Sequence, residues 1–330
     1  MGIKFSLLAV LALILVAFVG VEAVGMNYVF GVLVPYLAFF LFFCGFIYRI
    51  LKWARAPVPF RIPTTSGQQK SMSWVKQNKL DNPSSKLATI GRMALEVLLF
   101  RSLFKNTKME FRDGPKITYQ WEKWLWLAGL AFHYSFLVII IRHLRFFMEP
   151  VPAFVHTTEL VDGFLQVGLP GIYLTDLVFL AAVTYLFLRR VIIPQMRYIS
   201  LPADYFPLFL LLGLGLTGVL MRYFTKVDII KIKELAMGLA TLHPTVPEGI
   251  SVLFFIHLFL VSTLIAYFPF SKLMHLGGIF LSPTRNLPND SRIRRHINPW
   301  NYPVKVHTYD EYEDDFREKM IEAGLPVEKE

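Results

Sequence analysis

Long apolar runs alternate with polar segments along the chain. Each run holds about 20 mostly apolar residues, enough for a helix to cross a hydrocarbon core of about 30 Å. Six such runs are present, at residues 5–21, 26–48, 121–147, 171–188, 205–223 and 250–276. The pattern predicts an all-α polytopic membrane protein with about six transmembrane helices, four to five of which form a core bundle.

The first apolar run admits two interpretations. Lys4, the apolar stretch behind it and the pattern Val21-Glu22-Ala23 fit a cleavable secretory signal as well as a spanning helix. We expect this segment to be retained as a transmembrane helix.

The polar segments divide the chain into four parts: residues 1–50 (two N-terminal transmembrane helices), 51–120 (a basic loop), 121–280 (the membrane core) and 281–330 (a tail). In the loop, apolar positions at helical spacing predict an amphipathic helix over residues 86–104, lying on the membrane or against another subunit. A second interfacial helix is predicted after the fifth run. The tail is either a docking segment for a partner or a solvated, partly disordered end.

The distribution of Lys and Arg sets the orientation. The loop at 51–120 is strongly basic, whereas the link after the third run carries Glu149, Glu159 and Asp162 and no basic residue before Arg189. By the positive-inside rule the basic loop is cytoplasmic and the acidic link is external. The chain is therefore expected in the cell inner membrane, with a cytoplasmic C-terminus.

The composition limits which partners and cofactors the chain can have. Hydrophobic residues make up 55% of the chain and charged residues 18%, so the formal charge of +10 chiefly reports topology and gives no reason to expect nucleic acid. Cys44 is the single cysteine. An internal disulfide is excluded, and so is an iron–sulfur cluster held by this chain alone, because such clusters normally take four thiolates. Any such cluster belongs to a partner.

Four of the eight histidines lie in or at the ends of the third and sixth runs, where ionisable residues are costly and mark functional sites. Because these two helices run antiparallel, His133 and His275 lie near the cytoplasmic face, and His143 and His257 near the external face. Two histidines at one depth on facing helices suit a six-coordinate b-type haem. The sequence thus predicts two haem b groups, an inner one and an outer one.

The spacing contains a mismatch. On ideal helices, His133 and His143 are about 15 Å apart along the axis of the third run, whereas His257 and His275 are about 27 Å apart along that of the sixth. The 18 residues between His257 and His275 nevertheless return to the same helical face. Strong tilt, or a bend at Pro269, would reconcile the two. Three nearby cations are candidate partners of the haem propionates and equally suit ordinary interface anchors: Arg142, Arg145 and Lys272.

The spacings His-x9-His and His-x17-His resemble those of the nitrate reductase gamma-subunit family, over about residues 121–280. The resemblance implies a dihaem cytochrome b core in which His133 pairs with His275, and His143 with His257. Within that superfamily the chain looks most like the DsrM family, the cytochrome b subunits of DsrMKJOP complexes in sulfite and sulfate respiration.

Resemblance to the DsrM family implies oxidation of menaquinol near the outer haem. Electrons would then pass to a DsrK-like cytoplasmic iron–sulfur subunit and indirectly to DsrC, within a membrane oxidoreductase that has further membrane and periplasmic subunits. The segment at 158–168 lacks the lysine that the nitrate reductase family uses for quinol. His156, Glu159 and Asp162 are candidate acceptors for quinol protons, and Arg222 or Lys226 are candidate substitutes for the lysine.

Two other functions compete with a cytochrome. Intramembrane histidines also serve as proton relays in transporters, but the apolar runs hold almost no carboxylates, and Asp176 and Asp204 lie close to run ends. A haem-free membrane anchor for cytoplasmic subunits is the third interpretation, and it leaves the four matched histidines unexplained.

Overall fold

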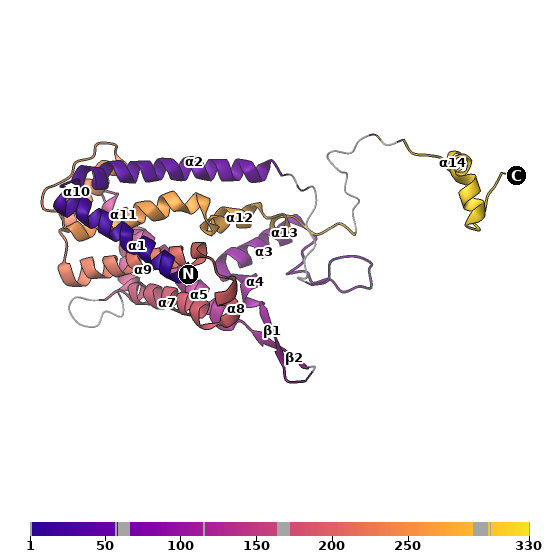
Figure 1. Cartoon of the computed structure of the whole chain (residues 1–330), viewed down its shortest axis with the longest axis horizontal. Coiled ribbons are helices and arrows are strands. Elements are labelled where there is room, and N and C mark those ends of the chain that lie inside the picture. Colours follow the sequence, from indigo (N-terminus) through magenta and orange to yellow (C-terminus); the bar gives the residue numbers. More distant parts are fainter. Residues whose placement is uncertain are drawn as a thin grey trace.

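A computed structural model describes residues 2–56, 58, 67–114, 116–163, 172–292, 303 and 305–329. The first residue of the fourth predicted run and the end of the segment at 158–168 lie outside these ranges. Within them the protein is a helical bundle with one small β-hairpin (Figure 1). The prediction of an all-α polytopic membrane protein is confirmed in its essentials.

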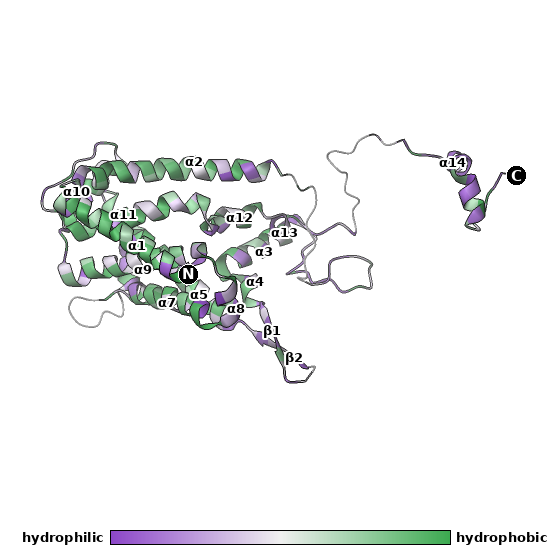
Figure 2. Ribbon diagram, in the orientation of Figure 1, coloured by the Kyte–Doolittle hydropathy of each residue, from purple (hydrophilic) through white to green (hydrophobic). Residues whose placement is uncertain are grey.

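Five of the described helical stretches are long and apolar enough to cross a membrane. Each includes a regular α-helix, and a π or 3-10 turn continues it at one end: α1 (Gly2–Phe18) to Ala23, α2 (Val34–Ala54) from Val29, α5 (Lys123–His143) to Phe146, α9 (Pro202–Val219) to Thr225 and α11 (Val252–Tyr267) to Phe270. Figure 2 shows that these helices are predominantly hydrophobic.

The fourth predicted run forms α7 (Leu174–Ile192), which packs between α5 and α9 (Figure 1). It carries Asp176 in its first turn and Arg189 and Arg190 in its last turn, so it is less apolar than the other five. The fourth predicted span is therefore present as a 19-residue helix of the bundle, but it has charged ends.

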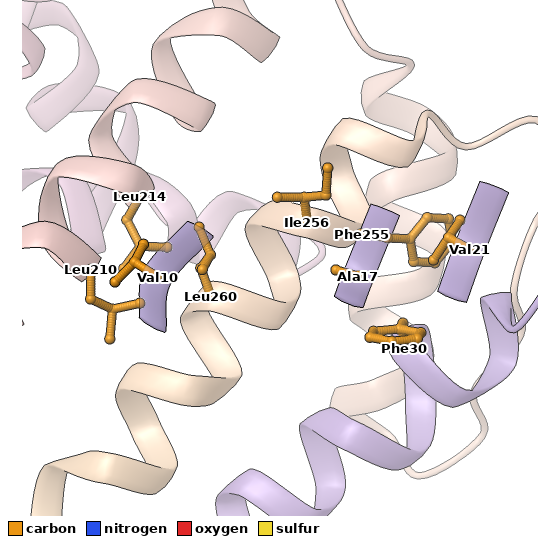
Figure 3. Packing of buried hydrophobic residues seen from close by; sticks show 9 residues of the cluster. All are labelled: Val10, Ala17, Val21, Phe30, Leu210, Leu214, Phe255, Ile256 and Leu260. Carbon is orange, nitrogen blue, oxygen red and sulfur yellow. The ribbon is translucent and has the colours of Figure 1, made fainter. Parts of the chain in front are cut away.

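The main core joins the N-terminal helix to the C-terminal half of the chain. Figure 3 shows Val10 of α1 beside Leu210 and Leu214 of α9 and Leu260 of α11. The outward faces of α1 and α2 are also apolar; for example, Phe5 is 65% exposed and Phe40 64%. An apolar surface on both sides of a helix is expected when lipid takes the place of water.

The last apolar run is not one continuous helix. After α11, a 3-10 turn covers Phe268–Phe270, Ser271 is extended, a second 3-10 turn covers Lys272–Met274, and α12 begins at His275 and ends at Leu281. Pro269 lacks the amide hydrogen that a continuing helix needs. The helix is thus interrupted at Pro269, one of the two ways by which the spacing mismatch could be reconciled. The argument that His257 and His275 share a face of one continuous helix does not hold.

The basic loop is more ordered than its sequence indicates. The predicted amphipathic helix is split into α3 (Lys86–Leu99) and α4 (Arg101–Phe104), because Phe100 between them has a left-handed backbone with a φ of 48°. An unpredicted antiparallel hairpin, β1 (Thr107–Arg112) and β2 (Lys116–Trp121), leads into α5. Its turn contains Gly114, whose φ of 79° suits glycine.

The buried face of α3 is polar. Arg92 donates to the carbonyl of Thr284, and Glu96 accepts from Arg285, both in the segment around α13 (Pro283–Asn286). The helix is amphipathic, but its polar side packs on the protein and its apolar side faces outward. Leu87, for example, is 80% exposed.

Four shorter helices complete the description: α6 (Ala153–Asp162), α8 (Pro194–Ile199), α10 (Ile229–Ala240) and α14 (Tyr309–Glu322). Helix α10 is the helix predicted after the fifth run; it starts at the cap Asp228, and its fully buried Leu235 packs into the bundle. Helix α14 lies apart from the bundle (Figure 1).

Candidate functional site

The two histidines predicted near the cytoplasmic face lie side by side. His133 belongs to α5 and His275 begins α12, and their ring centroids are 5.9 Å apart with ring planes at 82°. At a metal–imidazole distance of about 2 Å, two axial imidazoles on one metal have centroids roughly 6 Å apart. The spacing of this pair therefore suits a shared metal between the rings.

Three of the four histidines use Nδ1 in the same way. His133 Nδ1 lies 2.7 Å from the carbonyl oxygen of Gly129, His143 Nδ1 is 2.7 Å from that of Ile139, and His275 Nδ1 is 2.9 Å from that of Lys272. Because a carbonyl oxygen only accepts, Nδ1 carries the hydrogen and Nε2 keeps its lone pair. This is the arrangement by which outer hydrogen bonds orient metal-binding histidines.

The fourth histidine has a side-chain partner. His257 Nδ1 lies 2.8 Å from the Thr217 hydroxyl, which in turn lies 2.8 Å from the carbonyl oxygen of Gly213. The hydroxyl hydrogen goes to that carbonyl, so the hydroxyl oxygen accepts from His257 Nδ1 and Nε2 is again left free. Gly218 faces this ring, and a side-chain carbon there would meet it in ordinary van der Waals contact at 3.6 Å.

The surroundings leave room beside the rings. His143 lies near enough to His257 for the two rings to interact electrostatically, and His133, His143 and His275 are all exposed. Exposed imidazole surface within a bundle is what a prosthetic group requires. In the described part of the chain no three His, Cys, Asp or Glu side chains gather around a metal position; a haem iron needs only two protein ligands. The four histidines therefore fit haem b.

All three cations predicted to bind propionates contact protein carboxylates. Arg145 lies 2.8 Å from Glu159, and Lys272 lies 2.6 Å from Asp204. Arg142, which is buried, pairs with Asp162 and Asp176. The propionate role of these residues stays a prediction, since each already has a protein partner.

A buried polar cluster lies next to His143. Arg142 bridges Asp162 at 2.8 Å and Asp176 at 2.6 Å, and Asp176 also accepts from the Tyr223 hydroxyl at 2.7 Å. We call Arg142, Asp162, Asp176 and Tyr223 the outer network. Sequence reasoning missed it, although an aspartate and an arginine near the ends of apolar helices were a usable signal.

One aromatic ring joins the outer network to a second cation. The guanidinium of Arg142 lies 3.9 Å from the centroid of Tyr173, and that of Arg222 lies 4.0 Å from it. Arg222 is therefore near the outer histidine region, as the hypothesis of a lysine substitute requires. Lys226 ends the π-helical turn of α9 with a left-handed φ of 49°.

A cavity of about 370 Å³ lies beside this cluster, lined by His156, Glu159, Leu160, Gly163 and Tyr173. Two of the three predicted proton acceptors, His156 and Glu159, thus line one cavity. Asp162 is not among the lining residues: besides Arg142, it accepts from the backbone and the hydroxyl of Thr175, so its oxygens are already occupied.

Comparison with known proteins matches residues 93–294 to the family model of the nitrate reductase gamma subunit. Two archaeal proteins are similar over most of the chain, and both are named Hdr-like menaquinol oxidoreductase cytochrome b-like subunit. The protein of Archaeoglobus fulgidus is 48% identical over 280 residues, 83% of each chain. That of Archaeoglobus profundus is 45% identical over 281 residues, again 83% of each chain. With its helical bundle and these matches, the chain belongs to the nitrate reductase gamma-subunit family.

Proposed function

We propose that the chain is a dihaem b electron-transfer subunit that oxidises menaquinol near the external face and delivers electrons to a cytoplasmic iron–sulfur partner. The observation that carries this proposal is the pair of rings His133 and His275, 5.9 Å apart, with Nε2 left free on both. The printed names of the archaeal relatives support menaquinol as the electron donor.

His133 and His275 would hold the inner haem, and His143 and His257 the outer one. A haem iron with two imidazole ligands exchanges single electrons while the protein supplies its position and electrostatic surroundings. The hydrogen bonds of Nδ1 would fix the orientation of the imidazole rings.

The cavity beside the outer network is the proposed site of the quinol headgroup. His156 and Glu159 line it and are the proposed acceptors of quinol protons. Glu159 is held by Arg145 at 2.8 Å, which keeps its carboxylate directed toward the arginine. Asp162 accepts bonds from Arg142 and Thr175, and these contacts favour a structural role for it.

The electron acceptor must be a separate protein, because Cys44 is the single cysteine of the chain. A cytoplasmic subunit of the DsrK type, with DsrC as a more distant acceptor in sulfite-linked respiration, is the acceptor that the resemblance to the DsrM family implies. The Hdr-like designation of the relatives supports a multi-subunit complex of this general kind.

The test is haem content and its dependence on single histidines. The chain would be purified with its native partners in detergent, and haem b counted by the pyridine haemochrome method and by reduced-minus-oxidised spectra. We expect about two haems per chain in the wild type. His133→Ala and His275→Ala should each remove the same haem, and His143→Ala and His257→Ala the other.

A matched control is His243→Ala. His243 also has its Nδ1 against a backbone carbonyl, that of Thr241, but it lies in an exposed turn, so this variant should keep both haems. An intact complex without haem would overturn the proposal and favour a histidine-based transporter or a membrane anchor. Loss of a haem on replacing His243 would overturn the assignment of the ligands.

A further inference from the structure

The four candidate haem ligands differ in the hydrogen-bond partner of their Nδ1 atoms. His133, His143 and His275 each bond a carbonyl three or four residues earlier in their own chain segment. His257 instead bonds a side chain of another helix, Thr217 of α9, at 2.8 Å. The orientation of this one ring therefore depends on the packing of α9 against α11.

Thr217 is well placed to act as an acceptor. It is 7% exposed, and its hydroxyl lies 2.8 Å from the carbonyl of Gly213 and 3.1 Å from that of Leu214. Donation in that direction polarises the hydroxyl oxygen and strengthens its acceptance from His257 Nδ1. The hydroxyl has no other described partner that competes for its lone pairs.

We propose that Thr217 is the positioning residue of the outer haem, orienting His257 and lowering the reduction potential of that haem. The inference rests on the proposed function, since it assumes a haem held by His257. An Nδ1–H bond raises the basicity of Nε2, and a more basic axial ligand favours the ferric over the ferrous state. Without the hydroxyl, His257 would keep an unpaired buried donor and a less fixed ring.

The experiment is a redox titration of Thr217→Val in the full complex, with optical and low-temperature EPR detection of each haem. Valine keeps the shape and removes the acceptor. We expect the ratio of ferrous to ferric outer haem at a fixed potential to rise about tenfold, which corresponds to 59 mV for one electron. Its EPR signal should broaden or shift, and the inner haem should be unchanged.

Two variants serve as controls. Thr217→Ser keeps the hydroxyl and should restore the wild-type potential and EPR signal. Thr263→Val makes the same substitution in α11 at a threonine that bonds only the carbonyl of Phe259, at 2.8 Å, so both haems should be unaffected. These controls separate the loss of one hydrogen bond from a general effect of valine.

The outcomes distinguish this inference from the proposed function. Loss of the outer haem in Thr217→Val that serine restores also supports the positioning role. A wild-type potential and EPR signal in Thr217→Val, with two haems bound, overturn the role of Thr217 and leave the dihaem assignment intact. Absence of haem from the wild type overturns both.

Discussion

At the residue scale, one buried carboxylate, that of Asp81, holds part of the basic loop in place. Asp81 is 5% exposed and accepts hydrogen bonds from Arg101, at 2.7 Å, and from Lys105. Burial by itself raises the pKa of this carboxyl, but its hydrogen bonds to Arg101 and Lys105 and their positive charges outweigh it, and the pKa falls to about 2. Asp81 thereby ties the loop before α3 to the short helix α4.

The depressed pKa of Asp81 predicts an acid-dependent loss of stability. Since the folded-state pKa lies below the ordinary 3.8, the stabilisation is complete above about pH 4 and is lost as the pH falls toward 2. The thermal unfolding midpoint of the wild type, followed by tryptophan fluorescence, should exceed that of Asp81→Asn at pH 6, and the difference should shrink by pH 2.5.

The matched control for Asp81 is Asp113→Asn, at the exposed turn of the hairpin, where any effect on the midpoint should stay the same at both pH values. A difference between wild type and Asp81→Asn that stays constant down to pH 2.5 would contradict the role assigned to the ion pairs of Asp81.

At the scale of elements, the break in the helix after α11 determines the position of His275, one of the two candidate ligands of the inner haem. His275 begins α12 because the preceding segment, Phe268–Met274, forms two 3-10 turns around an extended Ser271. Gly45 of α2 makes room for this segment: a side-chain carbon there would lie 2.8 Å from both Pro269 and Phe270. The close approach of two helices thus decides where the ring of His275 lies.

Replacing Gly45 with valine should therefore displace the turn that carries His275. Overpacking of this kind costs about 1–3 kcal/mol, and relief by a shift of Phe268–Phe270 would separate His275 from His133. We expect about one haem per chain, with the spectrum of the outer haem, measured by the pyridine haemochrome method and difference spectra.

The control for this change is Gly91→Val in α3, where an added side chain meets nothing within 4 Å and two haems should remain. Two haems with wild-type spectra in Gly45→Val would show that the turn does not depend on this approach.

At the scale of the whole molecule, charge sets the direction in which the bundle crosses the membrane. The basic loop, with the polar face of α3 packed on α13, lies at the end of the bundle near His133, whereas α10 lies at the opposite end (Figure 1). By the positive-inside rule we expect the first end to be cytoplasmic. Electrons passing from the outer to the inner pair would then move toward the cytoplasm.

This orientation predicts the labelling of single cysteines by a membrane-impermeant maleimide. In a Cys44→Ala background, Ile230→Cys on α10 should react in right-side-out vesicles, since Ile230 is 80% exposed. Lys79→Cys in the loop and Glu322→Cys in α14 should react only in inside-out vesicles. Labelling of Glu322→Cys from the outside would place the C-terminus on the external face and contradict the assignment.

The sequence by itself determined the membrane helices, because crossing a hydrocarbon layer requires only length and apolar character, and both are local properties. It also singled out His133, His143, His257 and His275, since histidines within apolar helices are rare and costly. The β-hairpin was missed although its strands carry the signal: Met109 and Phe111, and Ile117, Tyr119 and Trp121, alternate with polar residues, as is typical of strands.

Only the tertiary structure decided how those histidines are held. The break before His275, the approach of Gly45, the outer network around Arg142 and the bond between Thr217 and His257 each join segments far apart in the chain. Such contacts depend on how helices pack, and the packing is set by many side chains at once. The four histidines were legible in the sequence as candidate ligands, whereas the distances and hydrogen bonds between them were not.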